Sequence, residues 1–196
     1  MNKEIKDIIN KDLSRIYDMP LSIKDKFLMP LEVKYIILWR KAQYYRHNDR
    51  RNVLGKIYNF RLMRLSMRSQ IQIPSEVTAD AGFFIGHLGR IIIHPDCVLG
   101  KNINIATGVT IGKVNRGQHF GVPSLGNNVW IGTNAVIVGN ISIGNDVLIA
   151  PGAYVNTSIP DHSVVIGNPA VIHPKGNATE GYICGLCYLR SRCTDV

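Results

Sequence analysis

Aliphatic residues recur at every sixth position through the second half of the chain. The anchors of this pattern are Ile93, Leu99, Ile105 and Ile111, followed by Leu125, Ile131, Ile137, Ile143, Ile149 and Val155. A small residue often follows an anchor, and a second small or aliphatic residue stands two positions before it. A period of six matches neither the 3.6-residue turn of a helix nor the alternation of a half-buried strand. It is typical of a solenoid in which three hexads close one triangular coil.

The repeat predicts a mainly β fold, a parallel β-helix over residues 71–173. Each coil should send its anchors inward, stack on the next coil through backbone hydrogen bonds and turn at corners where glycine is common. The register breaks once, between Ile111 and Leu125, where the segment KVNRGQHFGVPS leaves the coil. Such an excursion is usually functional or contacts another subunit.

Residues 1–70 have helical apolar spacing instead. The runs KEIKDIINKDLSRIYDM and PLEVKYIILWRKAQYYRHNDRRN, with Pro20 and Pro30 at segment boundaries, predict a short N-terminal α-helical region of three or four helices. Residues 174–196 form a C-terminal tail that contains Cys184, Cys187 and Cys193. A single CxxC spacing is weak evidence for a zinc site.

The positive charge of the chain is concentrated in the helical region. The net charge of the chain is +9. Residues 1–70 contain 16 basic residues (Lys and Arg) and 7 acidic residues (Asp and Glu), whereas residues 71–196 contain 7 basic and 7 acidic residues. A basic surface can bind nucleic acid or anionic lipid, or it can simply be solvated. No nucleic-acid-binding motif accompanies the charge, so we expect no nucleic acid partner. Peripheral association with an anionic membrane stays open as an expectation.

The expected location follows from two missing patterns. No stretch approaches the roughly 18 apolar residues of a membrane-spanning helix, and the start MNKEIKDIINKDL lacks the apolar core of a secretory signal. We therefore expect a cytoplasmic protein.

Four motifs resemble the serine acetyltransferases and the related sugar and capsule O-acetyltransferases. They are FFIGHLGRIIIHP, VTIG before the excursion, VPSLGNNVWIGTNAVIVGNISIG after it, and IGNPAVI near the end. The resemblance implies a left-handed coil and acetyl transfer from acetyl-CoA, with His87 as the catalytic base. A neutral imidazole can take the proton of an alcohol as the oxygen attacks a thioester. His87 also stands one hexad before Ile93, so we expect it at an anchor position, interrupting the apolar stack.

The resemblance also implies that acetyl-CoA lies in a groove between neighbouring chains of a homotrimer. The positions that match this groove are Gly112, Lys113, Thr133, Pro151, Gly152, Asn168 and Pro169. Val171 stands where the family often has a basic residue, so the phosphate contact is expected from Lys175 or His173. No metal is expected.

Four positions differ from the serine acetyltransferases. Gln72 and Gly86 stand where that family has acidic residues, and Gly121 and Val122 stand where it has an Arg-His pair. A zwitterionic amino acid would lose its charged partners there. We therefore expect the acceptor to be a carbohydrate hydroxyl, on a surface polysaccharide or its precursor. The candidate acceptor-binding residues are Gln72, Arg116 and His119.

Three alternatives to carbohydrate acetylation remain. Serine O-acetylation for cysteine biosynthesis is the nearest. A γ-type carbonic anhydrase would hold zinc with histidines such as His87, His94 and His119, although their spacing does not suit its ligand pattern. A non-catalytic scaffold would keep the trimer for binding alone.

Overall fold

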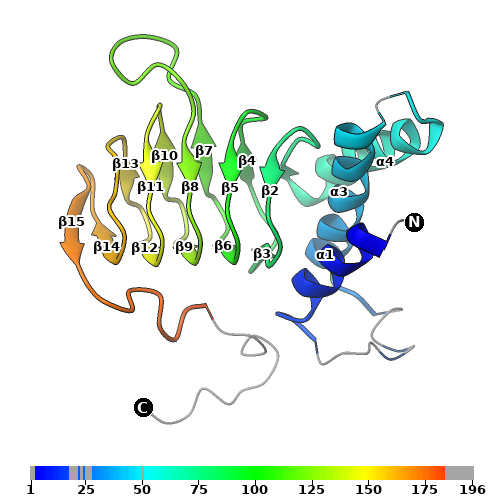
Figure 1. Cartoon of the computed structure of the whole chain (residues 1–196), viewed down its shortest axis with the longest axis horizontal. Coiled ribbons are helices and arrows are strands. Elements are labelled where there is room, and N and C mark those ends of the chain that lie inside the picture. The colour runs from blue at the N-terminus through cyan, green and yellow to red at the C-terminus, as the bar shows by residue number, and fades with distance from the viewer. Residues whose placement is uncertain (1–2, 18–21, 23, 25–27, 50, 184–196) are drawn as a thin grey trace.

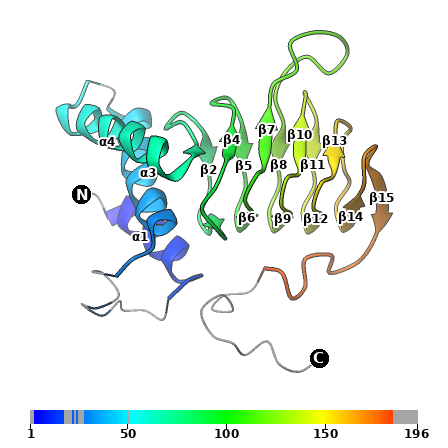
Figure 2. The ribbon, with the colours of Figure 1, turned by 180° about the vertical axis from the view of Figure 1, so that it is seen from behind.

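Helices pack against one end of a β-helix, as Figure 1 and the reverse view in Figure 2 show. The computed structural model describes residues 3–17, 22, 24, 28–49 and 51–183, so Cys184, Cys187 and Cys193 lie outside the described residues. The described helices are α1 (Lys3–Leu13), α3 (Leu31–Asn48) and α4 (Val53–Ser69). Within the described part of the chain, no helix combines the length and apolar character that a membrane crossing needs.

Three sheets form the faces of the β-helix, and all their strands are parallel except the last. Sheet A contains β1 (Ile71–Gln72), β4 (Ile91–Ile93), β7 (Thr110–Gly112), β10 (Val136–Val138) and β13 (Tyr154–Val155). Sheet B contains β2 (Thr78–Ala79), β5 (Val98–Leu99), β8 (Ser124–Leu125) and β11 (Ser142–Ile143). Sheet C contains β3 (Phe84–Ile85), β6 (Ile103–Ile105), β9 (Val129–Ile131), β12 (Val147–Ile149), β14 (Ser163–Ile166) and β15 (Val171–Pro174).

The sixfold pattern corresponds to the register of the coils. Ile93 lies opposite Ile111, and Leu125 lies opposite Ile143, so each of these coils advances by three hexads. Every anchor from Ile93 to Val155 is buried, with no more than 4% of its surface exposed. The predicted mainly β solenoid is therefore confirmed, and its core is a stack of aliphatic side chains.

The first coil is closed by side chains of α3, because no strand of the described residues lies beneath it to accept its backbone hydrogen bonds. The Tyr35 hydroxyl accepts a hydrogen bond from Ile73 N at 3.0 Å, and Trp39 Nε1 donates one to Pro74 O at 3.0 Å. Gln43 Nε2 donates to Val77 O at 2.7 Å. Burial raises the pKa of the Tyr35 phenol, which keeps it neutral and able to donate. α3 thus satisfies polar groups that would otherwise be orphaned at this end.

A buried ion pair fixes α1 and α3 to the same coil. Arg40 Nε lies 2.7 Å from Asp12 Oδ2, and neither side chain is exposed to solvent. Arg40 also donates to Ala79 O and Asp80 O, at 2.6 Å each, and Asp12 Oδ1 accepts from Gly82 N at 2.7 Å. The pair is therefore hydrogen-bonded on all sides, as a buried charge pair must be to persist.

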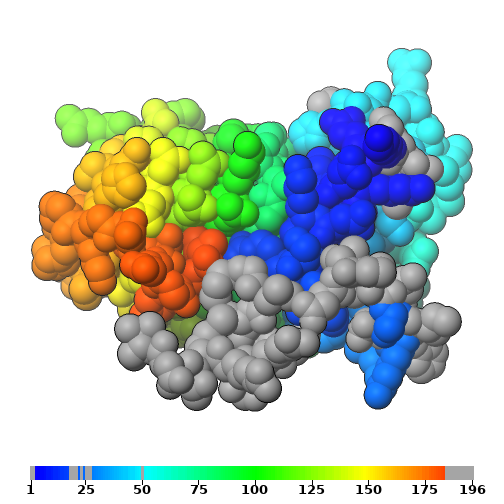
Figure 3. All heavy atoms as spheres, turned by 60° about the horizontal axis from the view of Figure 1, so that its bottom comes forward, coloured from blue at the N-terminus to red at the C-terminus, as the bar shows by residue number. Residues whose placement is uncertain are grey.

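After β15, residues 175–183 form a strap that returns across the β-helix toward α1. Figure 3 shows the strap in red beside the blue helix. The Asn104 side-chain amide donates to Tyr182 O at 3.0 Å, and the rings of Trp130 and Tyr182 lie 4.8 Å apart. Asn104 and Trp130 belong to sheet C, so the strap covers the outer side of that sheet.

Asp146 holds the strap through several hydrogen bonds. Its carboxylate accepts from Ala178 N and Thr179 N, at 2.9 Å each, from the Thr179 hydroxyl at 2.7 Å, and contacts His162 Nδ1 at 2.8 Å. Burial alone would raise the pKa of Asp146, but these hydrogen bonds outweigh burial and hold its pKa well below the usual value.

Replacing Asp146 with alanine should detach the strap and lower the free energy of unfolding by about 2 kcal/mol. Because the pKa of Asp146 is depressed in the folded protein, the stabilisation is complete well above the unfolded value of 3.8 and is lost as the pH falls below it. Hydrogen exchange at the Ala178 and Thr179 amides measures the attachment. Asp96→Asn, at a carboxylate with a 70% exposed side chain, is the control and should leave this exchange unchanged.

Candidate active site

His87 lies in the turn that joins β3 to β4, at the corner between sheets C and A. The turn has the sequence GHLGR, and the His87 side chain is exposed. Gly89 has a φ of 137° and packs so closely on the next coil that a Cβ there would collide with the Thr107 side chain. Gly89 and Thr107 therefore support the His87 turn. Sequence reasoning missed both, although a glycine two positions after the histidine was a visible signal.

The expectation that His87 occupies an inward anchor position is wrong. Ile93 pairs with Ile111, which lies three hexads further along the chain. Three hexads after Ile85 would end at Ile103, but Ile85 pairs with Ile105. The first coil is therefore longer than the next by two positions, and these fall in the turn between Ile85 and Ile91. Ile85, 1% exposed, takes the anchor position, and the longer turn carries His87 out of the apolar stack.

Several predicted cofactor residues stack along the same corner. Thr133 follows β9, Pro151 and Gly152 follow β12, and Asn168 and Pro169 follow β14. Backbone hydrogen bonds join successive coils here, from Asn134 N to Thr107 O at 3.0 Å and from Gly152 N to Thr133 O at 2.8 Å. Pro151, Gly152, Asn168 and Pro169 are exposed or half-buried, and Thr133 is half-buried. This corner therefore forms one accessible edge of the β-helix that begins at the His87 turn.

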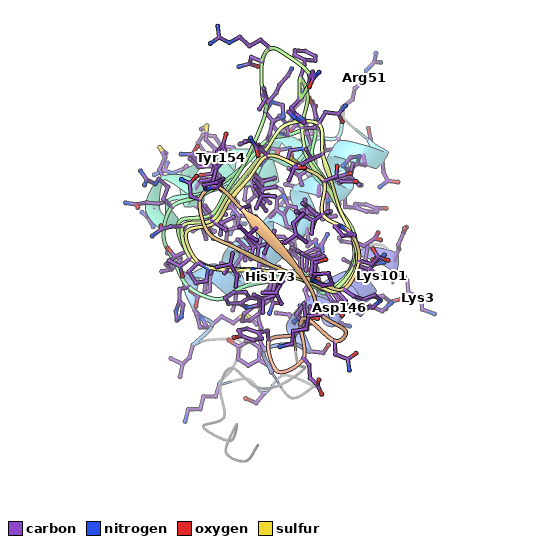
Figure 4. The ribbon with its side chains drawn as sticks, turned by 90° about the vertical axis from the view of Figure 1, so that its left-hand side faces the viewer. Lys3, Arg51, Lys101, Asp146, Tyr154 and His173 are labelled. Atoms are coloured by element: carbon purple, nitrogen blue, oxygen red, sulfur yellow. The ribbon has the colours of Figure 1, made fainter. Side chains whose placement is uncertain are left out.

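Gly112, Lys113, Arg116 and His119 lie at the opposite edge of sheet A. They belong to β7 and the excursion after it, the loop that stands clear of the coils in Figures 1 and 4. Val114 and Gly121 exchange two backbone hydrogen bonds of 3.0 Å at the base of this loop, and Asn140 N donates to His119 O at 3.0 Å. Lys113 Nζ lies 5.1 Å from the centre of the Phe120 ring. The loop is therefore a hairpin with a fixed base, and the side chains of Arg116 and His119 in it are exposed.

The predicted site residues thus form two groups on one chain, separated by the width of sheet A. Gln72 is exposed on that sheet, at the end of β1 opposite Ile92. Lys175 joins neither group, because its backbone N–H donates to His162 O at 2.7 Å, before β14 and at the other edge of sheet C. The end-on view in Figure 4 shows that these parts of the coil are far apart. Tyr154 of sheet A lies well away from Asp146, which comes directly before β12 of sheet C.

The other candidate chemistries find less support in the geometry. Across the described residues, no group of three or more His, Cys, Asp and Glu side chains is placed to hold a metal ion, so His87, His94 and His119 are not brought together. Cys97 is a buried free thiol, and burial raises its pKa to about 12. A thiol of this kind is a packing group and a poor nucleophile.

The stacked coils and their corner define the chain as a hexapeptide-repeat protein. Residues 123–157 match the family described as Bacterial transferase hexapeptide (six repeats). The fold is similar to that of the left-handed β-helix serine acetyltransferases, and the chain is similar in sequence to hexapeptide-repeat acyltransferases of this kind.

Three comparisons illustrate this similarity. Serine acetyltransferase 2 of Arabidopsis thaliana is 32% identical over 126 residues, which cover 60% of this chain and 39% of that protein. The Neisseria gonorrhoeae serine acetyltransferase structure with serine is 28% identical, with a TM-score of 0.72, and covers 88% of this chain and 70% of that one. The Brucella abortus structure is 26% identical, with a TM-score of 0.76, and covers 91% and 72%. The chain spans less than half the length of the curated relatives it matches.

The predicted carbohydrate acceptor is contradicted by these comparisons. The similar proteins are serine acetyltransferases, and one of the similar structures holds serine. Part of the reasoning for a sugar rested on Gly121, which has a φ of 136° and whose Cβ would lie 2.9 Å from the Asn140 Cβ. The backbone at the base of the hairpin therefore requires glycine there, and its lack of charge says nothing about the acceptor.

Proposed function

We propose that the chain transfers the acetyl group of acetyl-CoA to the hydroxyl of serine, with His87 as the general base. The observation that carries this proposal is the placement of His87, exposed on a glycine-flanked turn at the head of an accessible corner. The similarity to serine acetyltransferases supports serine as the acceptor.

The chemistry requires one proton to move twice. His87 accepts the hydroxyl proton as the serine oxygen attacks the thioester carbonyl, which gives a tetrahedral intermediate. Collapse of that intermediate breaks the carbon–sulfur bond, and the protonated imidazole returns the proton to the departing CoA sulfur. The products are O-acetylserine and CoA, and His87 is neutral again.

The separation of the two residue groups supports a homotrimer as part of the proposal. In one chain, His87 and the corner after β9, β12 and β14 lie at one edge of sheet A, while the hairpin lies at the other. A neighbouring chain can bring its hairpin to the His87 corner and close a groove that one chain leaves open. Arg116 and His119 then bind the serine carboxylate, Gln72 accepts from its ammonium group, and Lys113 faces the CoA phosphates.

Purified protein supplied with acetyl-CoA should release CoA when L-serine is added, with kcat/KM of about 10,000 per molar per second or more. A thiol reagent follows the release, and mass spectrometry identifies O-acetylserine. L-Alanine, which has the same charged groups but no hydroxyl, is the matched control and should give only background hydrolysis. Release that is the same with serine, alanine or no acceptor would reject the proposal.

A further inference from the structure

α4 exposes an apolar stripe along most of its length. Of its 17 residues only Gly55, Leu62 and Ser69 are buried. Apolar side chains at spacings of three or four residues lie between 46% and 71% exposed, namely Val53, Ile57, Phe60, Met63 and Met67. Residues at this spacing share one side of a helix. An exposed apolar stripe of this kind is typical of an interaction surface.

Basic side chains lie beside this stripe and, at Arg64, within it, where the guanidinium carbon lies 5.9 Å from the centre of the Phe60 ring. A groove of about 450 Å³ between α3 and α4 has a floor that includes Ile37, Leu38 and Leu65. Its rim carries five cations, Lys34, Lys41, Arg61, Arg64 and Arg68. None of the five forms an ion pair with another described residue, and α4 itself contains no acidic residue. The surface therefore combines apolar side chains with unneutralised positive charge.

We propose that α4 and the basic groove beside it bind the surface of an anionic lipid bilayer. A helix lying in the membrane interface inserts its apolar side chains below the headgroups and places its cations among the lipid phosphates. Phe60, Met63 and Met67 supply the apolar side chains. Arg61, Arg64 and Arg68 supply the cations from adjacent positions of the same helix. Arginine stems also pack on apolar surface while their charged ends stay at the phosphates.

Charge argues against a second copy of the chain as the occupant. A twofold contact between two α4 helices would place the same surface on both sides. Arg61, Arg64 and Arg68 of one copy would then approach the same cations of the other, with no acidic residue of α4 to pair with them. An anionic surface removes that repulsion.

Flotation with lipid vesicles tests the proposal on the full chain. The protein should bind vesicles of phosphatidylcholine mixed with phosphatidylglycerol, should not bind phosphatidylcholine alone, and should be released as the salt concentration rises. Each single change of Arg61, Arg64 or Arg68 to glutamine should weaken binding about fivefold. Phe60→Ser with Met67→Ser should weaken it without changing the charge.

A matched charge control separates this surface from general attraction. The triple variant Arg61→Glu, Arg64→Glu, Arg68→Glu should lose vesicle binding. Lys3→Glu, Lys6→Glu, Lys11→Glu makes the same change on exposed positions of α1, which lies apart from α4 in Figure 1, and should retain binding. Circular dichroism and CoA release check that all variants fold. The proposal would be overturned if both triple variants lost vesicle binding equally. It would also be overturned if the α4 variants kept vesicle binding and changed only the mass measured by light scattering.

Discussion

Replacing His87 with alanine should lower kcat/KM for acetyl transfer to serine by about 100 to 10,000-fold. The loss follows because the serine hydroxyl is a weak nucleophile unless a base takes its proton as it attacks. The affinity for acetyl-CoA should stay nearly unchanged, because the base acts on the acceptor and not on the nucleotide. Steady-state CoA release and equilibrium binding of CoA measure the two effects.

His47→Ala is the matched control for this variant. His47 is exposed on the last turn of α3, outside both groups of site residues, so its loss should leave turnover within about twofold of the unchanged protein, as expected for a surface position. Light scattering should give the mass of a trimer for both variants. A His87→Ala protein with more than a tenth of the original turnover would reject the assignment of His87, and a monomeric active protein would reject the shared groove.

Replacing Arg40 with alanine should lower the free energy of unfolding by about 3 to 5 kcal/mol. The change leaves the Asp12 carboxylate buried without its charged partner and removes the donors to Ala79 O and Asp80 O. Urea unfolding followed by circular dichroism measures the change. Arg46→Ala is the matched control, because Arg46 pairs with Glu76 through side chains that are 36% and 40% exposed, and it should cost less than about 1 kcal/mol.

Two further outcomes make the Arg40 experiment decisive. The double variant Asp12→Leu, Arg40→Met removes both charges and should be more stable than Arg40→Ala alone, because no buried charge is then left unpaired. If Arg40→Ala and Arg46→Ala had equal effects, the ion pair would not be what fixes the helices to the first coil.

The β-helix was predictable because its signal is local and repeated. Each anchor from Ile93 to Val155 marks one position of the coil, and the structure buries all of them. The register at His87 was not predictable from the same rule, since a fixed step of six cannot reveal that the first coil is two positions longer than the next. The pairing of Ile85 with Ile105 shows the difference only once the strands are aligned.

Contacts between distant segments account for most of what the sequence did not reveal. The positive charge of residues 1–70 gave no sign that Arg40 would be fully buried against Asp12, because that depends on how two helices meet the first coil. The attachment of Ala178 and Thr179 to Asp146 joins segments that are far apart in the sequence, and it leaves no periodic pattern. The placement of Lys175 away from the corner of Thr133 likewise depends on β15 running antiparallel to β14.

The hydrogen bonds from α3 to the first coil also decide how the solenoid ends. A stack of parallel coils has no intrinsic length, and an uncovered terminal coil would offer its strand edges to another molecule in an end-to-end polymer. Tyr35, Trp39 and Gln43 occupy those edges, so growth of the stack is blocked at this end. Because each coil contacts only its neighbours, whole coils of three hexads could be gained or lost beyond this point while α3 kept its role as a terminator.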